Sequence, residues 1–196
     1  MSSSPERFDL RRIAPQPWKN GAGVTREIAA GPVGSGANDF DWRFSLAEVE
    51  RDAPFSPFPG IDRCIVLLRG AGMRLRADGG ELDHRLDQPL APFRFSGDTP
   101  LSATLIDGPS SDFNVMTRRG AWTADVTTHR SAFEPASADV TLLLCSEGDW
   151  RVTEASLETL GPMQALLWRG PPPRIGISPL STGTLLLVRL CHDQNS

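Results

Sequence analysis

Four cationic side chains and two small polar ones stand out as groups that could bind an anion. Lys19 is the single lysine in a chain with 19 arginines, and it lies between Trp18 and the turn dipeptide Asn20-Gly21. A compact ammonium and a planar guanidinium are not interchangeable, so the retained lysine indicates a specific role. The predicted ligand-binding residues are Lys19, Asn20, Arg26, Arg43, Ser45 and Arg63.

These residue types suit a carboxylate. An ammonium and a guanidinium that converge in the mouth of a barrel would hold a carboxylate by charge-assisted, bidentate bonds. Each such bond contributes about 1.5–3 kcal/mol. Two of them with an amide contact correspond to a Kd between roughly millimolar and micromolar. We therefore expect a small anionic metabolite as the partner.

Structural explanations compete with this hypothesis. A lone lysine in a polar turn is commonly solvated. Arg26 can pair with Glu27 or Asp41, and a buried pair of Arg43 with Asp41 or Asp62 would be structural. The sequence leaves these alternatives open.

Patterns typical of metal binding or nucleophilic catalysis are absent from the sequence. His84, His129 and His192 are far apart, and there is no HxH, HxxxH or CxxC spacing. We therefore expect no metal site, no cofactor and no catalytic residue.

Proton transfer is nevertheless an alternative use of some side chains. Glu48, His84 or Lys19 could serve as an acid or base in a metal-independent enzyme. Asp112 and Asn114, two residues apart on one strand face, can cap a turn instead of contacting a ligand.

Short strands must position these groups. The chain has 18 glycines and 17 prolines, which interrupt it too often for long helices. Alternation in Phe40–Ala47 places Arg43 and Ser45 on the face opposite the large apolar side chains. Asp78-Gly79-Gly80 is typical of a hairpin turn. Roughly a dozen short strands with turns every 8–12 residues predict an all-β sandwich or barrel.

The size of the chain predicts one compact body of two β units. A chain of 196 residues buries about 70% of its surface, enough for a core without disulfides. A weak boundary near Gly120 divides it into residues 1–119, which carry the motifs, and residues 120–196, packed on the first unit.

Charge and hydropathy exclude several classes of protein. A net charge of -4 and a pI of about 5.4 argue against nucleic-acid binding by phosphate neutralisation. No apolar run is long enough for a membrane-spanning helix, and the N-terminus has no signal-peptide pattern. Cys64 and Cys145 lie in apolar runs, as expected for reduced core cysteines of a cytoplasmic protein.

Several segments, taken in order, resemble the HutD/Ves family of small bacterial proteins. The resemblance covers roughly Pro17 to Met116, and the part after Gly120 matches mainly by length. The segments are Pro17–Gly21 with Gly23–Ile28, Trp42–Ala47, Pro54–Arg63, and Asp107-Gly108 with Asp112–Met116.

The resemblance implies both a fold and a role. It implies a cupin-like (RmlC-like) jelly roll, in a bicupin-type arrangement of two β units, without the metal-binding histidines of cupins. It also implies a non-catalytic protein that regulates histidine utilisation by binding an intermediate such as N-formylglutamate or urocanate, and it is compatible with a homodimer. The alternative is a metal-independent cupin-fold isomerase, lyase or hydrolase that acts on a small carboxylic acid.

Overall fold

The chain folds almost entirely into β-strands. The computed structural model describes residues 4–36, 39–153 and 157–193, and the one helical turn in these ranges is the 3-10 turn η1 (Leu10–Arg12). No helix in the described residues is long and apolar enough to cross a membrane. The prediction of an all-β fold is confirmed.

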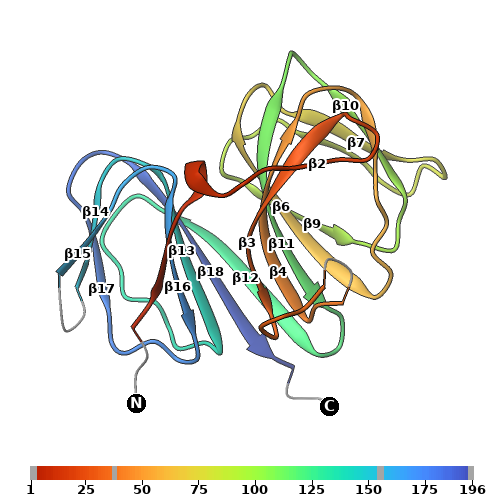
Figure 1. Cartoon of the computed structure of the whole chain (residues 1–196). Coiled ribbons are helices and arrows are strands. Elements are labelled where there is room, and N and C mark those ends of the chain that lie inside the picture. The colour runs from red at the N-terminus through yellow and green to blue at the C-terminus, as the bar shows by residue number, and fades with distance from the viewer. Residues whose placement is uncertain (1–3, 37–38, 154–156, 194–196) are drawn as a thin grey trace. The chain divides into compact units, whose positions relative to one another are not determined.

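The strands belong to two compact units (Figure 1). One unit is Ala14–Trp122, and the other joins Thr123–Ser196 to the segment that ends at Ile13. The division expected from the sequence, 1–119 and 120–196, lies three residues away and differs in the N-terminal segment. That segment joins the second unit because β1 (Glu6–Asp9) pairs with β16 (Gln164–Arg169).

The Ala14–Trp122 unit contains two antiparallel sheets. One has the order β2-β3-β4-β11-β6-β9 and the other the order β5-β10-β7-β8. The bounds of the first sheet are β2 (Gln16–Pro17), β3 (Gly23–Gly31), β4 (Trp42–Val49), β11 (Ser110–Arg118), β6 (Ile61–Arg69) and β9 (Pro92–Ser96). Those of the second are β5 (Ala53–Phe55), β10 (Leu101–Leu105), β7 (Met73–Ala77) and β8 (Asp83–Leu86).

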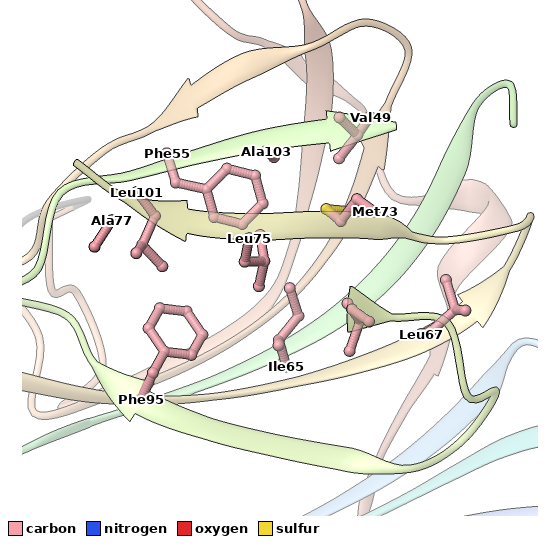
Figure 2. Packing of buried hydrophobic residues seen from close by; sticks show 11 residues of the cluster. Val49, Phe55, Ile65, Leu67, Met73, Leu75, Ala77, Phe95, Leu101 and Ala103 are labelled. Atoms are coloured by element: carbon pink, nitrogen blue, oxygen red, sulfur yellow. The ribbon is translucent and has the colours of Figure 1, made fainter. Parts of the chain in front are cut away.

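An apolar core fills part of the space between these two sheets. Figure 2 shows Ile65 and Phe95 of the larger sheet pointing toward Leu75 and Phe55 of the smaller one. Because side chains alternate along a strand, each strand of the larger sheet sends every second residue into this space. Val49 of β4 belongs to the core, which places the other odd-numbered residues of β4 on the inner face.

The second unit is also built from two sheets. Their orders are β1-β16-β13-β18-β12 and β15-β14-β17. The bounds are β12 (Trp122–His129), β13 (Val140–Glu147), β14 (Trp150–Thr153), β15 (Leu157–Leu160), β17 (Gly176–Pro179) and β18 (Thr184–His192). Its core includes Trp150, Trp168 and Leu187, which come from three different strands.

A cationic cavity as the candidate functional site

A cavity of about 700 Å³ opens inside the Ala14–Trp122 unit. Five of the six predicted ligand-binding residues line it: Lys19, Asn20, Arg43, Ser45 and Arg63. Among the described lining residues there are three cations and no carboxylate. A lining with an excess of positive charge favours an anionic occupant.

Strand register explains why these side chains converge. Met116 of β11 lies opposite Arg43 of β4 on one side and opposite Arg63 of β6 on the other. Asn114 lies opposite Ser45 in the next row of the same face. Two strand spacings separate the backbones of the two arginines by about 10 Å. The inner face of the sheet therefore presents two cations, one on each side of the Met116 thioether.

Arg63 is the most buried cation of the cavity. Its side chain lies among three aromatic rings, with its guanidinium carbon 5.4 Å from the ring centre of Phe55, 5.6 Å from that of Phe58 and 5.0 Å from that of Phe95. Nη2 donates a hydrogen bond of 2.7 Å to Oδ1 of Asn114. Nε is buried and has no hydrogen-bond acceptor among the described residues. The cation–π contacts orient the guanidinium, and its Nε donor remains unused.

Burial changes the acid–base behaviour of Arg63. It lowers the pKa of Arg63 from its usual value to about 10, because a low-dielectric surrounding disfavours the charged form. The Asp112 carboxylate opposes this shift, and the nearby Arg43 cation adds to it. The guanidinium therefore remains protonated at neutral pH.

Arg43 is partly neutralised by a carboxylate behind it. Its Nε donates a hydrogen bond of 2.7 Å to Oε2 of Glu27. The two acids considered from the sequence, Asp41 and Asp62, pair instead with Arg118 and Arg119, each at 2.8 Å. Arg43 therefore contributes less free positive charge to the cavity than Arg63 does.

The residues that follow β2 form the rim of the cavity. Trp18 Nε1 donates a hydrogen bond of 2.7 Å to Thr25 Oγ1, and the Trp18 ring meets Phe55 edge-on at 6.3 Å. Asn20 Oδ1 accepts a hydrogen bond of 3.1 Å from the Ala22 N–H. Lys19 is exposed between these two anchored residues. The turn thus holds an ammonium at the solvent side of the cavity.

Arg26 does not line the cavity. It forms an ion pair of 2.5 Å with Glu48, for which the sequence left open a solvated strand edge or an acid–base role. The reason is strand geometry: Thr25 lines the cavity, and its neighbour in an extended strand points to the opposite face.

Asn114 and Asp112 form a polar row that the sequence did not assign to the site. Asn114 lines the cavity, and its Nδ2 donates to Oδ1 of Asp112, which is fully buried behind it. Burial raises the pKa of Asp112 to about 7, although Arg63 and the hydrogen bond from Asn114 oppose the shift. Their spacing of two residues indicated that both side chains share one face of a strand. Whether that face meets the cavity depends on which strands pair with β11.

The histidines lie away from the cavity lining. His84 stacks on Phe93 with ring centres 3.6 Å apart, and burial lowers its pKa. His129 stacks on Phe133 in the other unit. Among the described residues, no group of three or more His, Cys, Asp or Glu could hold a metal ion.

Sequence comparisons identify the family to which the chain belongs. The HutD family model matches residues 11–186. Protein Ves of Cronobacter sakazakii is 35% identical over 165 residues, which is 84% of this chain and 87% of the relative. Protein Ves of Escherichia fergusonii is 36% identical over 155 residues, or 79% of each chain.

Solved structures agree with the sequence relatives. HutD from Pseudomonas fluorescens SBW25 superposes with a TM-score of 0.83 at 32% identity, covering 97% of this chain and all of that one. A cupin 2 conserved barrel domain protein from Leptotrichia buccalis superposes with a TM-score of 0.56 at 7% identity. The match covers 97% of this chain and 98% of that one, and it shows the fold alone. The fold is therefore cupin-like, and the chain belongs to the HutD family, with the Ves proteins among its relatives.

Proposed function

We propose that this chain is a non-catalytic regulator that binds a small carboxylate in the cavity of its Ala14–Trp122 unit. The observation that carries the proposal is Arg63, a buried cation that lines the cavity, lies among three aromatic rings and has no acceptor for its Nε among the described residues. A buried donor without a partner is costly unless a ligand or water completes it. A carboxylate would accept hydrogen bonds from the Arg63 guanidinium, while Lys19 attracts the charge at the rim.

The family supplies the biological setting of the proposal. HutD proteins are associated with histidine utilisation, and one solved HutD structure, from Pseudomonas fluorescens, is described as a formate condition. Formate is the simplest carboxylate. N-formylglutamate and urocanate, two carboxylates of histidine breakdown, are therefore the candidate ligands. The proposed setting is the cytoplasm, with all three cysteines free.

The positions of the candidate acids and bases favour binding over turnover. Glu48 is held by Arg26, and His84 stacks on Phe93. Neither side chain lines the cavity, so of the three groups considered for proton transfer only Lys19 reaches it.

Thermal unfolding against a panel of small acids tests the proposal. The panel is N-formylglutamate, urocanate, histidine, glutamate and formate. A ligand at about 100 times its Kd stabilises the folded chain by roughly 2.7 kcal/mol. For a chain of this size that raises the Tm by about 5–11 °C. We expect one or two of these acids to raise the Tm selectively.

Two matched variants locate the site. Lys19→Ala removes an exposed rim cation and should weaken binding about fivefold, since exposed charge contacts contribute up to about 1 kcal/mol. Arg26→Ala removes a cation outside the cavity and should leave the affinity unchanged. An equal loss in both variants, or no Tm shift with any acid, contradicts the proposal. Consumption of any acid, followed by NMR, would favour the enzyme alternative.

A further inference from the structure

Asp112 is a carboxylate placed directly behind the proposed anion site. It lies on β11 with no exposed surface, and it does not line the cavity. Asn114, two residues further along the same strand face, separates it from the cavity and contacts Arg63. A buried carboxylate so close to a cationic site must influence what that site binds.

The hydrogen bonds between these three residues run in one direction. A guanidinium has only donors, so the Asn114 oxygen must face Arg63. The Nδ2 amino group of Asn114 therefore faces Asp112 and donates a hydrogen bond to its Oδ1. Oδ2 of Asp112 is buried and has no hydrogen-bond partner among the described residues. The carboxylate thus lacks the full set of donors that would hold it permanently ionised.

Few charged groups face Asp112 from the neighbouring strands. Arg63 of β6 acts on the Asp112 carboxylate, and Arg43 of β4, which pairs with Glu27 of β3, acts on Arg63. In the adjacent strands its register partners are Ala47 and Leu67. The smaller sheet of the unit contributes apolar side chains to the core between the two sheets: Phe55, Met73, Leu75, Ala77, Leu86, Leu101 and Ala103. Arg63 is therefore the main counter-charge of Asp112.

We propose that a carboxylate bound at Arg63 is taken up together with a proton on Asp112, so that the site binds its anion more tightly at lower pH. This inference rests on the proposed function. Without ligand, the Arg63 cation faces one buried anion. A second anion at Arg63 repels the first through a medium of low dielectric, and protonation of Asp112 removes that repulsion.

The pKa of Asp112 makes the coupling observable near neutral pH. Burial raises its pKa to about 7, so that the free protein contains both forms between pH 6 and pH 8. A bound anion shifts this pKa further upward. By linkage, a group that binds protons more tightly in the complex makes the complex more stable as the pH falls through that range.

Calorimetric titration with formate and with N-formylglutamate tests the coupling. Carboxylates of this kind are ionised throughout pH 6–8, so the ligands do not cause a pH dependence themselves. If the ligand raises the pKa of Asp112 by one unit, affinity at pH 6 exceeds that at pH 8 about fivefold. Titration at pH 7.5 in two buffers of different ionisation enthalpy should show uptake of about half a proton per ligand.

Two variants assign the proton to Asp112. Asp112→Asn keeps a hydrogen-bonding group of the same shape and should bind with nearly the same affinity at pH 6 and pH 8. Glu27→Gln removes a carboxylate beside Arg43 and should change the affinity while leaving its pH dependence in place. If Asp112→Asn does not fold, carbon-13 NMR of the aspartate carboxyls in the unaltered protein should show one that titrates near pH 7, with an upward shift when formate is added.

The outcomes separate this inference from the proposed function. No binding of either acid at any pH overturns both. Binding with no proton uptake and equal affinity at pH 6 and pH 8 overturns the coupling and leaves the carboxylate site standing. A pH dependence that survives in Asp112→Asn also overturns the coupling, because another group then takes up the proton.

Discussion

At the scale of single residues, the unusual feature of the molecule is a guanidinium inside an apolar core. Burying a cation is costly unless its donors and its charge are compensated. For Arg63 the compensation comes from three aromatic rings, from the side-chain oxygen of Asn114, and from the Asp112 carboxylate on the far side of Asn114. That arrangement orients the side chain, and it leaves Nε without an acceptor among the described residues.

Arg63→Lys separates charge from geometry. The substitution keeps a cation, but a lysine has no planar fork to lie among Phe55, Phe58 and Phe95 or to hold a carboxylate by two bonds. Losing one charge-assisted bond of about 1.5–3 kcal/mol lowers carboxylate affinity at least about tenfold. Calorimetric titration measures the loss, with circular dichroism as the check on folding. Undiminished affinity would show that Arg63 acts only as a charge.

At the scale of strands, the site depends on the register of β4, β11 and β6. A slip of one residue would turn Asn114 and Met116 away from the cavity and place Phe113 and Val115 in it. Tight turns limit such slips. Gly72, just before β7, has a φ of +89°, and a Cβ there would lie 1.9 Å from the Leu86 carbonyl oxygen.

Gly72→Ala should therefore destabilise the Ala14–Trp122 unit. The added methyl group overlaps the backbone at the end of β8, and the backbone angle is unfavourable for any side chain, so the cost exceeds about 1 kcal/mol. Gly80→Ala is the matched control, since Gly80 has a φ of +79° with no atom within 4 Å of a Cβ. Urea unfolding should show the larger loss for Gly72→Ala; equal losses would mean that backbone strain alone matters there.

At the scale of the whole molecule, the chain forms two β units, and the second is discontinuous in sequence. Glu6 and Arg7 of β1 form ion pairs with Arg169 and Glu158, which lie in the Thr123–Ser196 part of the second unit. The Leu10 N–H then donates to the Met163 oxygen at 2.9 Å. Whether the two units represent the bicupin-type arrangement implied by the family resemblance stays a prediction.

Deletion of residues 1–9 should weaken the second unit selectively. Removing β1 exposes the edge of β16 and eliminates several backbone hydrogen bonds, which costs roughly 2–5 kcal/mol. Hydrogen exchange should accelerate in β16 and β13, while carboxylate binding in the Ala14–Trp122 unit persists. Faster exchange centred on β4 and β11 instead would contradict this assignment of the N-terminal segment.

The sequence by itself determined the class of fold, the family and all three cations among the described residues that line the cavity. Alternation and frequent glycine and proline are local properties, so they predicted strands and the shared face of Arg43 and Ser45. The family segments contain Lys19 and Arg63, which the structure also places at the cavity.

Only the tertiary structure decided which strand faces enclose the cavity. Arg26 points away because Thr25 takes the inner face of β3. Asn114 lines the cavity and Asp112 lies behind it because β11 pairs between β4 and β6. The same holds for β1, which joins a strand more than 150 positions further along. Periodicity assigns side chains to faces, but the pairing of distant strands determines what those faces meet, and that pairing is set by packing of the whole chain.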